Sequence, residues 1–534
     1  MVNAMFIIAT ALGAAFLLGL LRDSWRVTAY AVTLAALACM SWIAAGWLWA
    51  FAVAGAAPVE IFTAGTAPPF AINLRMALPE AAALLLVNLT GLLAALYLRD
   101  TLLKQGRRAM AVLLIFTMAL GGIIVTRDIF NLFVFFELTV ISTGGLILLS
   151  MDKRALGAGF KYLIASQLIS ILLLVGIIFS YHATGTLNID GMADASASLM
   201  KAGSLAFFLM FIAIVAELKP FPANGWALDI YESAHPAFSA LLSAAAGTAA
   251  LFAIDKLLLI GGSAWLPVAT GIGVLSFVGA NLFALAQTSD RRLLGYSSVA
   301  QIGLILAIIG QRDILGDSYL FIAGGILLAH AVGKAGLFWL SGLVAGRELT
   351  AWTALRGRPL LIFAFVTFIA LLTGLPPFPG FYAKWELIHI LAGEGRIALL
   401  ALILSGALIE AGYLFRWFGY IIKRETAAEA AACPPQKVAV IAAAVAGGWA
   451  LAWLWGDLSG HSNLLFAPPL LFALGFLLLD WLPAWIKNTL AIAGMVAWFI
   501  AGYPGYDPLQ LIFSAIILLG GALILLASYH AHGR

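Results

Sequence analysis

Apolar stretches of about 20 residues recur along almost the whole chain, and they limit its fold more than any other feature. A helix needs about 20 apolar residues to cross the hydrocarbon core of a bilayer. With 63% hydrophobic and only 10% charged residues, the chain has too little polar surface for a soluble domain. We therefore predict an all-α polytopic membrane protein. About 17 spans are expected, with centres near residues 12, 40, 88, 117, 138, 170, 211, 245, 275, 302, 328, 368, 408, 446, 471, 494 and 519.

The positive charges predict how these spans are oriented. Loops that follow odd-numbered spans carry 18 lysines and arginines, whereas loops that follow even-numbered spans carry 6. Basic loops stay on the cytoplasmic side of a membrane. We therefore expect a multi-pass protein of the cell inner membrane, with the N-terminus outside and the C-terminus inside. The first stretch, residues 4–21, lacks a basic n-region, so we expect a retained anchor and not a cleaved signal.

Several classes of chemistry have no support in the sequence. The two cysteines, Cys39 and Cys433, lie far apart, and no CxxC or Cys/His cluster occurs. No glycine-rich phosphate loop follows a strand-like segment. The net charge of +4 reflects the distribution of charges among the loops, so we expect no nucleic-acid partner. We predict neither a cofactor nor a metal on this chain.

Four ionisable residues interrupt the apolar stretches where a charge is unfavourable. They are Glu137, Lys219, Lys334 and Lys384, and His330 lies four residues before Lys334. An ionisable group at membrane depth costs several kcal/mol unless it is paired or hydrated, so it marks a functional site by default. Residues spaced i, i+4 share a helix face, which favours a relay step at the His330–Lys334 pair. We expect these five residues to form a proton relay.

These residues also have structural interpretations. Glu137 could be a carboxylate hydrogen-bonded to Ser or Thr, and Lys219 could extend its amine to the membrane interface. Accessory roles are open for further polar residues, and the arginine among them could simply pair with a carboxylate. This wider set comprises Glu217, His235, Thr248, Glu386, His389, Glu410 and Arg416.

Two Pro-Phe-Pro triplets, which begin at positions 220 and 377, suggest an internal repeat. Proline removes a backbone donor and clashes with the preceding turn, so each triplet should break its helix. The triplets are separated by about five span-plus-loop units, and an odd number inverts the direction of the second helix. Inverted repeats with broken helices are typical of secondary transporters. The prolines expected at the breaks are Pro220, Pro222, Pro376, Pro377 and Pro379.

The repeat leads to a predicted domain organisation. Residues 1–105 form peripheral helices, and residues 106–422 form an ion-translocating core whose halves are 106–260 and 261–422. Residues 423–534 provide C-terminal helices for packing or docking. We thus expect about 14 core transmembrane helices with inverted repeats and two broken helices, plus about 3 extra C-terminal helices.

Five segments resemble a known family, that of the proton-translocating antiporter-like membrane subunits. This family includes subunits of respiratory complex I, of membrane-bound hydrogenases and of multisubunit Mrp-type Na⁺/H⁺ antiporters, and the wording DIFNLFVFFE is most similar to the D-type Mrp subunit or its hydrogenase relatives. The segments are Asp128–Ser142, Glu217–Ser243, Ala286–Gly303, His330–Phe338 and Gly374–Lys384.

The resemblance implies roles for four residues. Glu137 matches the family's helix-5 glutamate, and Lys219 matches its helix-7 lysine. Lys334 matches the lysine of the HxxxK motif, and Lys384 matches the helix-12 lysine. The chain departs from the family at 239–254, where relatives often carry a histidine or lysine and this sequence has no ionisable side chain. We therefore expect Ser or Thr hydroxyls and water to replace the missing ionisable group, or the relay to be interrupted there.

The resemblance implies a subunit of a multisubunit membrane complex, with other hydrophobic subunits and the lipid bilayer as partners. It would move H⁺, alone or in exchange for Na⁺, along a hydrated central axis. The alternative is a proton-pumping membrane-arm subunit of a complex I-like NADH-quinone oxidoreductase or a membrane-bound hydrogenase, with redox chemistry on other chains. A second alternative is a structural membrane scaffold with a degenerate relay.

Overall fold

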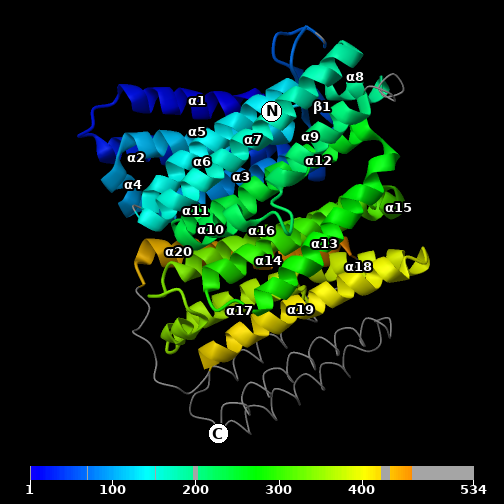
Figure 1. The fold of residues 1–534 in the computed structure, drawn as a ribbon. Helices are drawn as coiled ribbons and strands as arrows, with labels where there is room; N and C mark the ends of the chain where they lie inside the picture. The colour runs from blue at the N-terminus through cyan, green and yellow to red at the C-terminus, as the bar shows by residue number, and fades with distance from the viewer. Residues whose placement is uncertain (1, 69, 151, 196–202, 423–432, 460–534) are drawn as a thin grey trace. The chain divides into compact units, whose positions relative to one another are not determined.

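The computed structural model describes residues 2–68, 70–150, 152–195, 203–422 and 433–459 (Figure 1). Helices dominate this part of the chain, because each apolar stretch must satisfy its own backbone hydrogen bonds within the membrane. Within these described ranges, eleven helices are long and apolar enough to cross a bilayer, and three more are apolar but shorter. The first 14 predicted span centres all fall in helices, which confirms a polytopic all-α fold. The centres at 471, 494 and 519 lie outside the described residues.

The helices follow one another with short connections. Their bounds are α1 (Met5–Leu20), α2 (Arg26–Ala52), α3 (Leu78–Tyr97), α4 (Arg99–Gln105), α5 (Arg107–Val125), α6 (Ile129–Ile147), α7 (Lys153–Thr184), α8 (Ile189–Asp194), α9 (Gly203–Glu217), α10 (Gly225–Ser233), α11 (Pro236–Leu241), α12 (Gly247–Gly261), α13 (Leu266–Leu285), α14 (Asp290–Ile309), α15 (Arg312–Leu315), α16 (Tyr319–Ser341), α17 (Pro359–Thr373), α18 (Pro379–Gly393), α19 (Ile397–Ile422) and α20 (Pro435–Leu458). Short 3₁₀ turns cover Leu148–Ser150, Ser263–Trp265, Gly316–Ser318 and Leu349–Leu355.

The chain forms two compact units. The first comprises Met1–Ala280, Arg291–Asp313 and Pro435–Val440. The second comprises Asn281–Asp290, Ile314–Pro434 and the described part of Ile441–Arg534. The predicted boundaries after residues 105, 260 and 422 stay predictions.

In the first unit, α5 packs against α1 and α6, α6 against α7, and α7 against α9 (Figure 1). The strands β1 (Val59–Phe62) and β2 (Asn73–Met76) form an antiparallel hairpin in which Val59 pairs with Met76 and Phe62 with Asn73. The hairpin continues directly into α3, and the backbone N–H of Arg127 donates to the carbonyl of Asn73 at 3.0 Å. The hairpin is therefore fastened to the end of α5.

Each Pro-Phe-Pro triplet lies at a break in a helix. In the first unit, α9 ends at Glu217 and α10 begins at Gly225. In the second unit, α17 ends at Thr373 and α18 begins at Pro379. Proline has no N–H to continue a helix but suits the first helical position, which explains both the interruption and the new start at Pro379. The two predicted broken helices are therefore present.

The uncharged segment 239–254 is helical throughout and contains a π-helical turn at Leu242–Ala246, between α11 and α12. Nearly all of the span Pro236–Gly261 is buried. A π turn widens the helix locally and is frequent at functional sites. The segment that lacks an ionisable side chain is thus central in its unit and irregular in its backbone.

Candidate functional site

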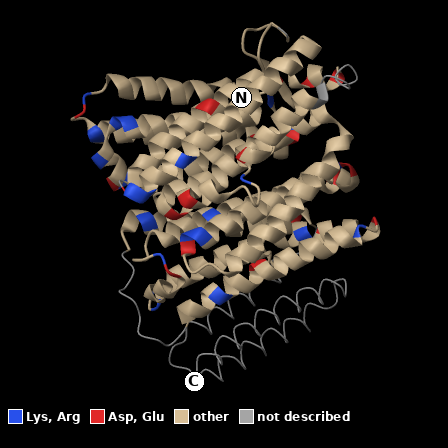
Figure 2. Cartoon of the chain, in the orientation of Figure 1, with Lys and Arg blue, Asp and Glu red and all other residues tan. Residues whose placement is uncertain are grey.

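Charged residues are sparse along the helices of both units (Figure 2). The predicted site residues divide between the units, and each unit contains its own cluster. Among the described residues, no group of three or more His, Cys, Asp or Glu side chains is placed to hold a metal ion.

In the first unit, Glu137 projects from α6. Asp128 caps the start of this helix, because its side chain accepts from the backbone N–H of Asn131 at 2.7 Å. Gln167 on α7 donates to Oε2 of Glu137 at 3.5 Å, near the limit for a hydrogen bond. The other carboxylate oxygen of Glu137, Oε1, is buried and has no hydrogen-bond partner in the described part of the chain. The carboxyl group therefore keeps an open position for a proton or a water.

Lys219 lies at the first helix break in a strained backbone conformation. Its φ is 60°, a left-handed value that costs a residue other than glycine about 1–2 kcal/mol. The side chain is 6% exposed, and its Nζ donates to the carbonyl of Glu217 at 3.3 Å. Nζ also lies 6.0 Å from the centre of the Trp226 ring. Within the residues that the structure describes, neither Glu137 nor Glu217 forms an ion pair with Lys219.

A tyrosine that sequence reasoning missed belongs to the same cluster. Tyr162 on α7 is buried, lies within electrostatic reach of Glu137 and Glu217, and packs against Trp226 with ring centroids 5.5 Å apart. Its hydroxyl is beside Thr143 and Ser166. The signal in the sequence was a tyrosine followed four residues later by a serine within an apolar stretch. The cluster thus joins two carboxylates, a lysine and several hydroxyls.

In the second unit, Lys384 on α18 contacts a buried carboxylate. Its Nζ lies 3.8 Å from Oε2 of Glu410, whose side chain is 0% exposed. The same Nζ donates to the carbonyls of Leu372 and Thr373, each at 3.2 Å, at the end of α17. The break frees these carbonyls from helical partners, and the lysine satisfies them. Lys384 therefore holds the broken helix together and pairs with Glu410.

His330 and Lys334 lie one turn apart on α16, and both are buried. Lys334 interacts electrostatically with Glu410 and Lys384. The second unit therefore brings two lysines and one carboxylate together, with a histidine one helical turn away.

The accessory candidates are placed differently. Thr248 donates to the carbonyl of Ala244 in its own helix at 2.6 Å. His389 is exposed, and Glu386 accepts from the Ser318 hydroxyl at 3.0 Å. Arg416 donates to the backbone carbonyls of Leu285 and Gln287 at the end of α13, in place of the carboxylate pairing that the sequence left open.

Hydroxyl groups occupy the segment that lacks an ionisable side chain. Ser243 in the π turn and Ser298 on α14 are hydrogen-bonded through their hydroxyls at 2.7 Å. The Tyr231 hydroxyl is a hydrogen-bonding neighbour of both serines. All three residues are buried. Hydroxyls both donate and accept, so this group can pass a proton without holding a charge.

His235 caps the start of α11, because its Nδ1 accepts from the backbone N–H of Ala237 at 3.2 Å. Burial, together with the nearby charges of Lys437 and Arg291, lowers the pKa of His235 to about 3. The histidine is therefore neutral in the folded protein at pH 7 and serves as an acceptor.

This pKa predicts an acid-sensitive stability. An unfolded histidine has a pKa of about 6.5, so between about pH 6.5 and pH 3 the unfolded chain binds a proton that the folded chain refuses. Stability is complete above pH 6.5 and falls with pH through that window, by about 2 kcal/mol at pH 5. His235→Asn keeps a capping acceptor without titrating, so its unfolding temperature should drop less than that of the wild type between pH 7.5 and pH 5. The exposed His389→Asn is the control, and equal drops in wild type and His235→Asn would contradict the prediction.

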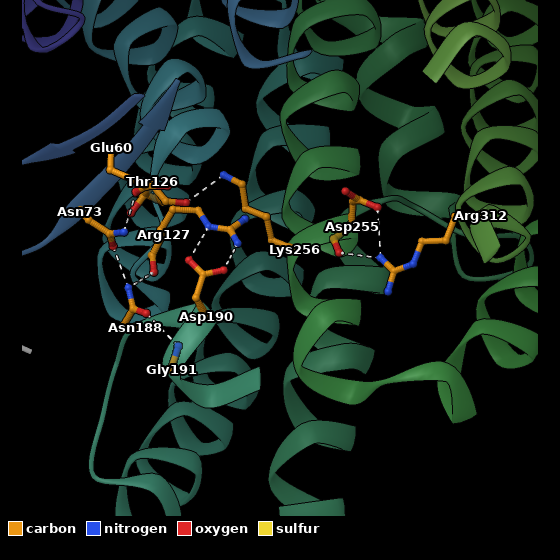
Figure 3. Close-up of polar contacts among 10 residues, drawn as sticks. All are labelled: Glu60, Asn73, Thr126, Arg127, Asn188, Asp190, Gly191, Asp255, Lys256 and Arg312. Carbon is orange, nitrogen blue, oxygen red and sulfur yellow. Dashed lines mark hydrogen bonds and ion pairs between the residues drawn. The ribbon is translucent and has the colours of Figure 1, made fainter. Parts of the chain in front are cut away.

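Sequence reasoning also missed Lys256, which is one of the 6 basic residues that it counted in the loops after even-numbered spans. Lys256 lies within α12 and is only 3% exposed. Its Nζ donates to the Thr126 carbonyl at 2.9 Å, beside the Arg127–Asp190 ion pair (Figure 3). The signal available in the sequence was a lysine that directly follows Asp255 within an apolar stretch.

Known proteins share both the sequence pattern and the fold. Residues 126–410 match the family model described as NADH:quinone oxidoreductase/Mrp antiporter, TM. NADH-quinone oxidoreductase subunit N of Desulforudis audaxviator (strain MP104C) is 30% identical over 380 residues, which are 67% of this chain and 74% of that protein. F(420)H(2) dehydrogenase subunit N of Methanosarcina mazei is 30% identical over 347 residues, covering 60% and 69% of the two chains.

Two solved structures extend the comparison. A chain of the archaeal membrane-bound sulfane sulfur reductase superposes with a TM-score of 0.75 at 26% identity, covering 86% of this chain and 96% of that one. A chain of the Mrp complex from Dietzia sp. DQ12-45-1b superposes with a TM-score of 0.72 at 22% identity, covering 89% and 98% of the two chains, and supports the fold. The family model covers more than half of the chain and contains Glu137, Lys219, Lys334 and Lys384. The chain belongs to the NADH:quinone oxidoreductase/Mrp antiporter transmembrane family.

Proposed function

We propose that the chain is a proton-translocating, antiporter-like subunit of a multisubunit membrane complex. The proposal rests on the cluster in the second unit. There Nζ of Lys384 donates to the carbonyls at the helix break and lies 3.8 Å from Oε2 of the buried Glu410. A buried ion pair is costly to form and is therefore weak evidence for a purely stabilising role. Its position at a helix break, beside Lys334, favours proton transfer.

The proposed relay uses Glu137 and Lys219 in the first unit, and His330, Lys334 and Lys384 in the second. Glu217 and Glu410 act as accessory carboxylates that change the charge around the lysines. The Tyr231, Ser243 and Ser298 hydroxyls serve as the uncharged step in segment 239–254. The excess of basic residues in alternate loops supports an N-terminus outside and a C-terminus inside.

The driving reaction is supplied by partner chains. The 30% identity to subunit N of NADH-quinone oxidoreductase favours a redox-driven complex as the setting. Exchange of H⁺ for Na⁺ is the second candidate, favoured by the Mrp-like fold. Transport that requires Na⁺ and proceeds without a redox substrate would identify exchange, whereas transport that requires electron flow would identify a pump.

The test is proton movement across proteoliposomes that contain the purified complex. Glu137→Gln removes the carboxyl's ability to exchange a proton and keeps its shape, so ΔpH formation should fall below a tenth of the wild-type rate. The exposed Glu394→Gln is the matched control and should transport normally. Transport at the wild-type rate by Glu137→Gln would contradict the proposed relay and would favour the interpretation as a structural scaffold.

A further inference from the structure

The ammonium group of Lys256 on α12 caps the C-terminal end of α5, and all three of its N–H donors take part. Its Nζ donates to the carbonyls of Ile123 and Thr126, each at 2.9 Å, and to that of Ile124. These carbonyls end α5, where a helix leaves its last carbonyls without helical partners. An ammonium group has three donors and no acceptor, so the three contacts use it completely.

These contacts depend on the protonation state of the lysine. A neutral amine has two donors and a lone pair, so loss of the proton removes at least one bond. The lone pair then faces a carbonyl oxygen, which is repulsive. The chain runs from Thr126 through Asp128 directly into α6, which carries Glu137. The end of α5 therefore connects the protonation of Lys256 with the start of the relay helix.

Four charged groups interact electrostatically with Lys256. They are Glu80 on α3, Arg75 on β2, Arg127 after α5 and Asp255 on α12 itself. Arg127 is bound by both carboxylate oxygens of Asp190, and Asp255 interacts with Arg312 at 3.5 Å (Figure 3).

Glu80 differs from the neighbouring carboxylate of Asp255. Its side chain is 8% exposed, and its Oε2 is buried with no hydrogen-bond partner among the described residues. An unpartnered, buried carboxylate oxygen is costly unless it takes up a proton or a water. Because Glu80 interacts electrostatically with the buried Lys256, it is the natural acceptor for that lysine's proton.

We propose that Lys256 and Glu80 form a second proton-exchange site, separate from the relay, whose protonation state controls the junction between α5 and α6. The proton leaves Nζ of Lys256, breaking one N–H bond, and forms an O–H bond on the Glu80 carboxylate. Glu80 then passes the proton to solvent, so its O–H bond breaks, the carboxylate is restored and the site loses one positive charge. The protonated lysine binds the carbonyls at the end of α5, and the neutral lysine no longer binds all of them. The inference rests on the proposed function, because a proton must reach this site.

Hydrogen–deuterium exchange of the purified complex in nanodiscs tests the site without measuring transport. The measured quantity is the protection of the backbone amides from 123 to 131, corrected for the intrinsic effect of pH on exchange. In the wild type, protection should fall at least tenfold as pH rises and the lysine loses its proton. Lys256→Arg keeps the donors but does not release a proton, so protection should stay high at every pH. Lys256→Met should be unprotected at every pH.

A lysine that only caps α5 would give a different pattern. Lys256→Arg would then respond to pH as the wild type does, or the wild type would not respond at all, and either result overturns the proposal. Glu80→Gln removes the negative charge that favours the protonated lysine, so protection in this variant should fall at a lower pH than in the wild type. The control is Asp313→Asn, which neutralises a mostly exposed carboxylate beside Arg312 and should behave as the wild type. If Lys256→Met does not fold, the arginine and Glu80→Gln variants still decide the result.

A further variant separates this proposal from the proposed function. Glu137→Gln should stop transport yet keep the pH response of the amides from 123 to 131. Loss of transport without any wild-type pH response would overturn only the second site. A normal pH response with normal transport by Glu137→Gln would overturn only the relay.

Discussion

Lys384→Met should abolish proton transport and lower the stability of the protein by about 3 kcal/mol, because it removes one partner of a buried ion pair and leaves the Glu410 carboxylate buried. The change also removes the donors that satisfy the Leu372 and Thr373 carbonyls at the break. The measurements are ΔpH formation in proteoliposomes and thermal unfolding of the purified complex. A surface pair sets the scale: Lys161→Met, opposite Asp229, should cost less than about 1 kcal/mol.

A second substitution separates the stability effect from the functional effect. Adding Glu410→Leu to Lys384→Met also removes the buried carboxylate of the pair, so the double variant should recover most of the lost stability. Transport should stay below a tenth of the wild-type rate in the double variant, because both proton-exchanging groups are gone. Recovery of transport together with stability would mean that the pair only holds the fold.

Lys219→Gly should also stop transport, but without a loss of stability. Lys219 adopts a left-handed φ of 60°, which glycine accepts without strain and other residues accept at a cost. The glycine variant should therefore be about 1 kcal/mol more stable than Lys219→Ala, which loses the same amine and keeps the strained backbone. Both should transport at less than a tenth of the wild-type rate in the same vesicle assay.

Lys219→Arg tests whether the positive charge alone is sufficient. Arginine keeps the charge near Trp226 and Glu217 but does not release a proton under these conditions. Folding should be preserved and transport should still fall at least tenfold. Wild-type transport by the arginine variant would show that Lys219 supplies charge and does not exchange its proton.

The elements that sequence reasoning placed correctly have local causes. The first 14 span centres fall in helices because an apolar stretch of about 20 residues has one stable arrangement in a bilayer. Both breaks lie at Pro-Phe-Pro because proline ends a helix through its own ring. The buried positions of Lys334 and Lys384 followed from the apolar residues around them. The roles of these residues and the domain boundaries stay predictions.

The errors and omissions involve contacts between distant segments. Lys256 was counted among the loop residues, and only the fold places its amine against the carbonyls of Ile123 and Thr126 at the end of α5, 133 and 130 residues earlier. Arg416 was left with a possible carboxylate partner, whereas it bonds the carbonyls at the end of α13. Tyr162 drew no attention, because its neighbours Glu137 and Glu217 lie on other helices.

The sequence by itself determined that this is a membrane protein, where its helices lie, where two of them break and which spans carry charges. Each of these depends on residues within one or two turns of each other. The tertiary structure alone decided which groups the charges contact: Glu410 beside Lys384, the end of α5 around Lys256, and Ser298 opposite Ser243. A side chain's partner depends on how helices pack, and packing joins residues that lie far apart along the chain.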